Sequence, residues 1–336
     1  MARAVTSNQR RRRARRRRLS SVVSVIVVAG APAACSAPAV SRGAFEQSYL
    51  AADHNWAFRR RFPRADRLLN AFDYGHAKLY QTLVTRSDAA ARIDGPEFDF
   101  ITGRLLPHPP DVPLDESAIG PDYAKLVPEL VALFDWAHLL HRQLYDVWSA
   151  AGVTDQQRDI EAARVIRYYR SRTDLALSTR PKSMVLMEGQ PYSLAFRKQD
   201  PKFNGLLWSY HWFQLALYDA LIVGRTQSQL DAGIDSVTKQ FFAMITDAPS
   251  NMPREMPMAP VASPRFADRY PEAAVIFDNL HSLHDVVSDI LASPTIAKSQ
   301  KRAALLAAAA AYRDDTTAVT SLDEWRQMAH AMAPRP

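Results

Sequence analysis

The sequence predicts an all-α protein: a helical bundle with a central four-helix core, additional flanking helices and long proline-rich loops. Apolar residues recur at helical spacing, as in Leu68, Phe72, Leu79 and Leu83, which indicates a helix with one buried face. No stretch alternates β-branched and polar residues as a half-buried strand does. With only 11 glycines and no glycine-rich phosphate loop or Gly-x-Ser-x-Gly motif, the chain lacks the signatures of nucleotide-binding folds and α/β-hydrolases.

In chain order, helices are predicted over residues 45–59, 64–84, 123–151, 155–174, 203–223, 226–245, 271–292 and 294–312, with a short last helix after residue 321. Three pairs predict helix starts by N-terminal capping: Thr154 with Gln157, Thr226 with Gln229, and Ser321 with Glu324. Segments 87–121, 175–201 and 248–264 contain prolines and no periodicity, so they are predicted to be loops. The second is long enough to be a lid or a binding loop.

The N-terminus is predicted to be a secretory signal peptide over residues 1–34. It has an arginine run, an apolar stretch over 19–34 and small residues around a cleavage point. The apolar stretch is short for a membrane span. We predict a spacer over residues 35–44 and a single all-α domain over 45–336.

Two features of this segment leave the export route open. Arg17-Arg18-Leu19-Ser20 fits a twin-arginine signal. Cys35 follows Ala33-Ala34 and resembles a bacterial lipoprotein box, although cleavage by an ordinary signal peptidase is an alternative. We therefore expect an exported protein, periplasmic or on the outer surface, with a membrane anchor if Cys35 carries lipid.

The basic character of the chain comes from this N-terminus. Residues 1–34 contain nine arginines and no acidic residue, so removing them changes the formal net charge from +7 to −2. Nucleic-acid binding is therefore not expected. The single cysteine excludes an intramolecular disulfide, a thiolate cluster and a c-type haem attachment motif.

The pattern Phe-Asp-x-x-His occurs three times, ending at His76, His138 and His281, and His211 lies in a fourth helix of related sequence. Residues three apart share one face of a helix, so each copy presents a carboxylate and an imidazole in the same direction. This is the geometry of Glu-x-x-His in di-iron and di-manganese bundles. The residues predicted to hold a metal are His76, His138, His211, His281, Asp73, Asp135 and Asp278.

Further polar residues repeat at fixed distances from these histidines. His141 and His284 follow by three residues, but they point further round the helix and are predicted to be structural. The remaining members are predicted to line the cavity or support the ligands: Tyr145, Tyr218, Asp146, Asp219 and Asp289.

The nature of the cofactor stays open at this point. The aspartates are either ligands or groups that orient the imidazoles, and iron, manganese, copper and zinc all fit such donors. Haem b between two histidines, with Trp136, Trp208, Trp212 and Phe213 nearby, is an alternative. The functional hypothesis is an exported bundle with a redox or metal-handling role, and the sequence leaves open whether it is an enzyme.

The main alternative is a non-catalytic periplasmic interaction protein or structural lipoprotein. In that case the His and Asp repeats form a buried hydrogen-bond network. Convergence of the four histidines on one point would favour the metal, whereas histidines that each bond their own aspartate would favour the network.

One short motif resembles a known family. Ser209-Tyr210-His211-Trp212-Phe213-Gln214 resembles the Gly-x-His-x-x-Glu motif of imelysin-like proteins, which are exported helical bundles linked to iron. Ser209 and Gln214 replace the glycine and the glutamate, and the resemblance covers one helix, so no function is carried over from it.

Overall fold

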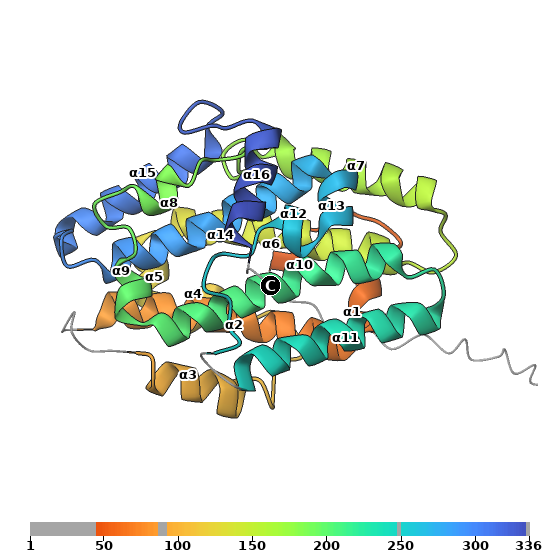
Figure 1. Cartoon of the computed structure of the whole chain (residues 1–336), viewed down its shortest axis with the longest axis horizontal. Helices are drawn as coiled ribbons and strands as arrows, with labels where there is room; N and C mark the ends of the chain where they lie inside the picture. Colours follow the sequence, from red (N-terminus) through yellow and green to blue (C-terminus); the bar gives the residue numbers. More distant parts are fainter. Residues whose placement is uncertain (1–44, 87–92, 247–249, 334–336) are drawn as a thin grey trace, which may run out of the picture. The chain divides into compact units, whose positions relative to one another are not determined.

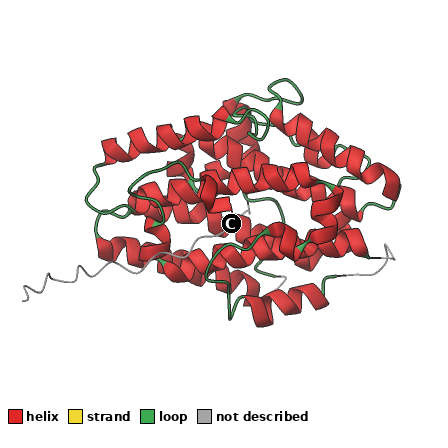
Figure 2. Cartoon of the chain, turned by 180° about the vertical axis from the view of Figure 1, so that it is seen from behind, coloured by secondary structure: helices red, strands yellow, loops and turns green. Residues whose placement is uncertain are grey.

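The computed structural model describes residues 45–86, 93–246 and 250–333, all within a compact unit that spans residues 40–336. The predicted signal peptide and Cys35 lie outside the described residues. Within them the structure has sixteen α-helices and no strand, and the only β-pairing is an isolated bridge between Lys182 and Val319 (Figure 2). The prediction of an all-α helical bundle is confirmed.

Four long helices carry all the histidines of the repeated pattern and are called the histidine helices: α2 (Pro63–Thr85), α6 (Pro128–Ser149), α10 (Pro201–Val223) and α14 (Pro271–Ala292). Each follows a short helix, respectively α1 (Ala57–Arg61), α5 (Pro121–Leu126), α9 (Ala195–Gln199) and α13 (Pro264–Arg269). The others are α3 (Pro96–Phe100), α4 (Glu116–Ile119), α7 (Asp155–Ser171), α8 (Val185–Glu188), α11 (Gln227–Thr246), α12 (Ala259–Ala262), α15 (Lys301–Arg313) and α16 (Leu322–Met332). The histidine helices pack against one another, and the remaining helices flank them (Figure 1).

A proline begins every histidine helix, and one residue links it to the short helix before it. These linking residues are Phe62, Val127, Asp200 and Tyr270, with φ between −127° and −147° and ψ between 57° and 67°. Proline has no N–H to donate and keeps the preceding residue out of the helical region, so the chain must break there. The predicted helix over 123–151 is therefore divided at Val127 into α5 and α6.

Each histidine helix also caps the short helix that precedes another histidine helix. Positions in each histidine helix are counted from its first proline, which is position 0. In all four helices the side chain at position 18 accepts backbone N–H hydrogen bonds: Gln81 from Asp122 and Tyr123 of α5, Asp146 from Trp56 and Phe58 at α1, Asp219 from Arg265 and Phe266 of α13, and Asp289 from Leu194 and Phe196 at α9. The first N–H groups of a helix lack partners within the helix, which is why these acceptors are needed. The caps are reciprocal within the pair α2 and α6 and within the pair α10 and α14.

Two helix starts differ from the sequence prediction, and the segments predicted to be loops contain the short helices α3, α4, α8, α9 and α12. Instead of one helix over 45–59, the chain forms a 3-10 turn at Phe45–Ser48 and begins α1 at Ala57, after Trp56 adopts a positive φ of 62°. The last long helix begins at Lys301 rather than at residue 294, because the hydroxyl of Ser293 accepts the N–H of Thr295 in a turn. The N-terminal caps predicted at Thr154, Thr226 and Ser321 are confirmed.

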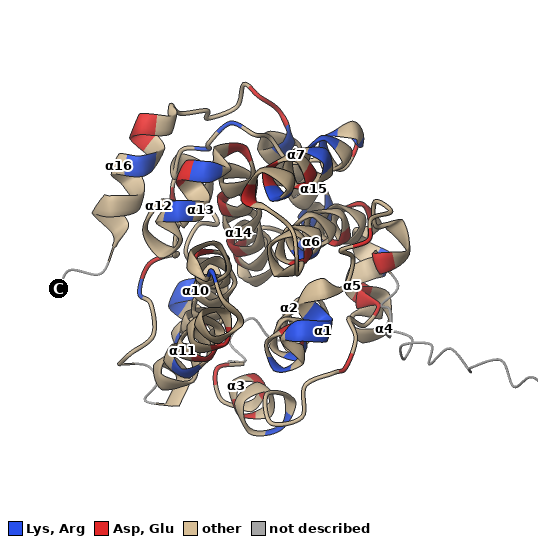
Figure 3. Ribbon diagram, turned by 90° about the vertical axis from the view of Figure 1, so that its right-hand side faces the viewer, with Lys and Arg blue, Asp and Glu red and all other residues tan. Residues whose placement is uncertain are grey.

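Figure 3 looks along the long helices, and its ribbon marks Lys, Arg, Asp and Glu positions on outer helices such as α7, α11 and α16. Of the helices in the described ranges, none is both long enough and apolar enough to cross a membrane. Most of the buried polar residues belong to the histidine helices.

Candidate metal centre

Six of the nine histidines are buried together between the histidine helices. Each of these six residues is at most 8% exposed: His76, His138, His141, His211, His281 and His284. Neighbouring rings have centroids 3.9 to 6.5 Å apart, from the stacked pair His211 and His281 to the pair His281 and His284. This set is called the histidine cluster.

The cluster follows a register set by the prolines. Position 10 of the four helices is occupied by Asp73, His138, His211 and His281, and position 13 by His76, His141, Gln214 and His284. Positions 10 and 13 are one helical turn apart on the same side of a helix. The Phe-Asp-x-x-His match placed His76 with His138, but the structure aligns His76 with His141 and His284. The repeated start with proline is the sequence signal that could have given this register.

Three members of the cluster bring their ring nitrogens close enough to share one ion. One nitrogen each from His76, His211 and His284 lies within 4.8 Å of the other two. His76 and His211 were predicted as ligands, whereas His284 was expected to be structural. His138 lies beside this group, with its ring centroid 5.9 Å from that of His284.

The ring nitrogens of the cluster have few hydrogen-bond partners. Among the described residues, both nitrogens of His76, His141 and His211 are buried without one, as are Nδ1 of His284, Nδ1 of His281 and Nε2 of His138. Leaving a buried polar atom unsatisfied costs about 1–3 kcal/mol, and native proteins contain few such atoms. A concentration of them at one point indicates a ligand that binds nitrogen.

Burial keeps these imidazoles neutral. It lowers the pKa of His76, His211 and His284 well below the usual value of histidine, and the neighbouring histidines lower it further. The pKa of His281 falls to about 3 for the same first reason. Neutral imidazole is the form that binds a metal, so protons compete little for these nitrogens near pH 7.

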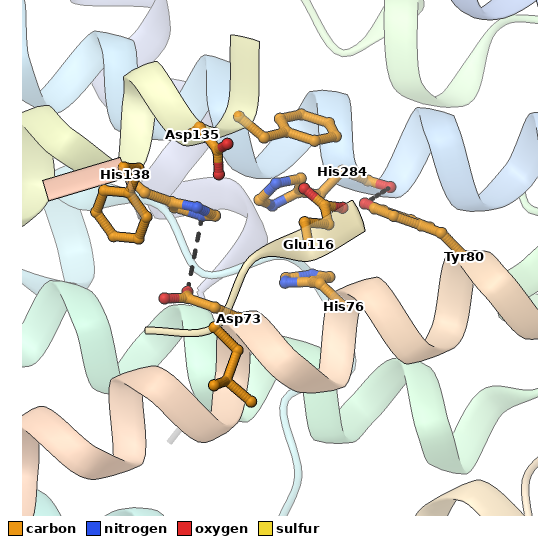
Figure 4. A pocket seen from close by; sticks show the side chains of 10 residues that line it. Asp73, His76, Tyr80, Glu116, Asp135, His138 and His284 are labelled. Carbon is orange, nitrogen blue, oxygen red and sulfur yellow. Dashed lines mark hydrogen bonds and ion pairs between the residues drawn. The ribbon is translucent and has the colours of Figure 1, made fainter. Parts of the chain in front are cut away.

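A small cavity of about 10 Å³ lies beside the histidines, with room for about one water molecule or an ion. His76, His138 and His284 form part of its wall, together with three carboxyl groups, those of Asp73, Asp135 and Glu116 (Figure 4). Asp73 and Asp135 were predicted from the sequence. Glu116 was not, because it belongs to α4, a four-residue helix outside the repeated pattern.

The carboxyl groups around this cavity are held in different ways. Burial raises the pKa of Asp135 to about 7, and the nearby carboxylates of Asp115 and Asp73 raise it further. Burial and the same kind of repulsion raise the pKa of Glu116 well above its usual value. Asp73 instead pairs with Arg142, with Oδ2 at 2.9 Å from Nη2, and its Oδ1 lies 3.9 Å from Nε2 of His138.

Other predicted site residues have structural partners. Both carboxylate oxygens of Asp278 accept hydrogen bonds, from the backbone N–H of Ala259 and from the indole of Trp325, so this predicted ligand faces α12 and α16. The aspartates at position 18, namely Asp146, Asp219 and Asp289, serve as helix caps in place of the cavity-lining role expected from the sequence.

Three of the four residues at position 17 are tyrosines that bridge neighbouring helices, and the hydroxyl of Tyr80 donates to the carbonyl of His284 at 3.4 Å. The hydroxyl of Tyr145 donates to the carbonyl of Gln214 at 2.7 Å, and that of Tyr218 donates to the carbonyl of His141 at 3.2 Å. All three carbonyls belong to residues at position 13 of the register. The tyrosines therefore hold the backbone that carries the cluster.

Comparison of this chain with protein-family models, with curated proteins and with solved structures found no match. The function must be argued from the site itself.

Proposed function

We propose that the protein binds a transition-metal ion in the centre of the bundle through His76, His211 and His284, and that the ion serves a redox or metal-handling role. The observation that carries the proposal is the convergence of three buried, neutral imidazoles whose nitrogens lie within 4.8 Å of one another. Each of these histidines has at least one ring nitrogen without a hydrogen-bond partner among the described residues. An ion would satisfy several costly polar atoms at once.

The donor set favours some metals over others. Imidazole suits zinc, copper and iron, whereas manganese prefers carboxylate and water ligands. Of the carboxyl groups at the cavity, Asp73 is engaged by Arg142. Asp278 is engaged by α12 and α16. We therefore place zinc, copper and iron ahead of manganese.

The cavity beside the three histidines supports a reactive centre. Three protein ligands with an open neighbouring position are typical of catalytic zinc sites, whereas structural sites are closed by a fourth protein ligand. Such an ion would make a bound water more acidic or carry electrons, according to the metal. Asp135 lines the cavity, and with a pKa of about 7 its carboxyl can accept or give up a proton near neutrality.

The haem b alternative has less support. The imidazole centroids lie 3.9 to 6.5 Å apart, and the cavity beside them holds about 10 Å³. A macrocycle between two axial histidines would have to displace rings such as Phe72, whose centroid is 4.3 Å from that of His76. The histidines as packed fit an ion.

The alternative of a structural hydrogen-bond network draws on the aspartates rather than on the histidines. Asp146, Asp219, Asp278 and Asp289 are all bonded to backbone or indole N–H groups. In the part of the chain that the structure describes, no histidine of the cluster has a hydrogen bond to an aspartate of its own helix. A network would require those bonds.

Purification without chelator, followed by elemental analysis and an absorption spectrum, tests the proposal. We expect zinc, copper or iron in stoichiometric amount and no Soret band. His284→Ala should lose the metal and keep the helical circular dichroism signal, while His330→Ala, an exposed histidine of α16, should retain the metal. A folded wild-type protein that takes up none of these metals would overturn the proposal in favour of a structural network.

We also propose that the chain is exported and held at a membrane through a lipid on Cys35. The arginine run, the apolar stretch over 19–34 and the small residues before Cys35 support this. Mass spectrometry of the mature N-terminus and membrane fractionation of Cys35→Ser test it. A wild-type protein that retains residues 1–34, or a soluble one cleaved elsewhere, would contradict the anchor.

A further inference from the structure

The four histidine helices are related by approximate twofold symmetry, which is visible in their reciprocal contacts. The caps at position 18 pair α2 with α6 and α10 with α14. The hydroxyl of Tyr145 in α6 donates to the carbonyl at position 13 of α10, and the hydroxyl of Tyr80 in α2 donates to the carbonyl at position 13 of α14. The ring pair His76 and His211 of α2 and α10 recurs as the pair His141 and His281 of α6 and α14, with centroids 5.7 and 6.0 Å apart. Contacts of the same type thus recur with the helices exchanged.

This symmetry assigns a counterpart to each ligand of the first centre. Exchanging α2 with α6 and α10 with α14 carries position 13 of α2, position 10 of α10 and position 13 of α14 onto a second set. The three histidines His76, His211 and His284 thereby correspond to His141, His281 and Gln214.

The second set has the properties of an ion site. His141 is 2% exposed, His281 is 1% exposed and Gln214 is 4% exposed. Both ring nitrogens of His141 and Nδ1 of His281 are buried and lack a hydrogen-bond partner in the described ranges. The amide oxygen of Gln214 lies 3.1 Å from Nε2 of His281. With the proton of His281 on Nδ1, the lone pair of Nε2 lies beside the amide oxygen of Gln214, so that both atoms can bind one ion.

We propose that His141, His281 and Gln214 form a second metal position, so that the bundle holds a two-ion centre. The inference rests on the proposed function, because it extends the same cluster. The second position replaces one imidazole with an amide, which is a weaker donor, so its ion binds after the first and less tightly. The rings of His211 and His281, one from each set, stack at 3.9 Å with an interplanar angle of 9° and link the two positions.

The experiment is a titration of the metal-free full chain with Co²⁺ at neutral pH, followed by visible absorption and calorimetry. The wild type is expected to bind two ions, the second more weakly. His141→Gln and His281→Gln should each bind one ion with the affinity of the first. Gln214→His, which completes the three-imidazole set, should tighten the second ion by at least about tenfold. Melting curves of the metal-free variants show that each one folds.

The outcomes separate this inference from the proposed function. One ion in the wild type, with no change in His141→Gln, His281→Gln or Gln214→His, overturns the second position and leaves the first intact. Two ions in both glutamine variants overturn it as well, because the second ion would then lie elsewhere. No ion in the folded wild type overturns both proposals.

Discussion

Buried polar side chains near the end of a histidine helix are hydrogen-bonded, whereas those in its middle largely lack partners in the described structure. At position 18, Asp146 and Asp289 are 3% exposed, and each accepts two backbone N–H groups from a neighbouring short helix. At positions 10 and 13, histidines buried to the same degree leave most of their ring nitrogens without a partner among the described residues. One repeated sequence unit thus stabilises the fold at one position and leaves costly groups unsatisfied about one to two turns earlier.

The difference indicates what each part is for. A buried polar group that is fully hydrogen-bonded fixes how two helices meet, whereas an unsatisfied one is retained only when something other than the fold uses it. The helix ends therefore serve folding, and the histidine cluster is the part that the proposed ion would use. Four experiments test this contrast.

The largest effect is expected at the helix ends. Asp146→Ala removes the acceptor for the N–H groups of Trp56 and Phe58, and each lost partner costs about 1–3 kcal/mol. We expect the free energy of unfolding to fall by about 2–5 kcal/mol, measured by denaturant titration, with metal stoichiometry unchanged in the folded fraction. Asp235→Ala on the exposed face of α11 is the control. A loss below about 0.5 kcal/mol would show that the cap is dispensable.

The opposite result is expected in the middle. His76→Leu replaces a ring whose two nitrogens have no partner in the described structure with an apolar side chain. The stability of the metal-free protein should change by no more than about 1 kcal/mol, because no satisfied hydrogen bond is lost. The stabilisation gained on adding metal to the wild type should disappear, which thermal melts with and without Zn²⁺ measure. A metal-free variant as unstable as Asp146→Ala would mean that His76 serves the fold.

The contributions of the two regions to the free energy of unfolding should also change with pH in opposite directions. Unfolded histidine takes up a proton below about pH 6.5, but folded His281 does so only near pH 3, so acid favours unfolding between these values. Burial raises the pKa of Asp146 to about 8, so folding keeps a proton there that the unfolded chain loses, and stability falls as pH rises from about 4 to 8.

Unfolding of the metal-free protein from pH 3 to 8 tests these signs. His281→Gln should reduce the acid-side slope and Asp146→Asn the neutral-side slope, each by at most about 1.4 kcal/mol per pH unit. The same slope in a variant and in the wild type would show that the replaced group does not titrate as burial predicts.

The sequence predicted more of the fold than of the site because helices are local and the cluster is not. The span 271–292 and the three N-terminal caps were read correctly, since apolar spacing and capping pairs are encoded by neighbouring residues. The division at Val127 was missed, although Pro128 marks it, because the apolar pattern continues across the break.

At the site, the type and burial of the residues could be predicted but not their partners. Asp73-x-x-His76 and Asp135-x-x-His138 look alike in sequence, yet the prolines place them one turn out of register. His284 joins the converging group because α14 meets α2 near position 13, and Glu116 reaches the cavity from a short helix with no repeat. Such encounters depend on how helices cross, which no local pattern records.

The smallest expected effect concerns the cavity that joins the cluster to its carboxyl groups. Near pH 7 the carboxyl group of Asp135 is partly protonated, because burial raises its pKa to about 7. A cation at the neighbouring histidines lowers that pKa, so metal binding should release a fraction of a proton from Asp135. Calorimetric titration with Zn²⁺ in two buffers of different ionisation enthalpy measures the number released. Asp135→Asn should release fewer protons with unchanged stoichiometry, whereas Asp235→Asn should match the wild type. Equal release in all three proteins would show that the proton on Asp135 does not respond to the ion. The cavity would then be only a packing defect at the edge of the cluster.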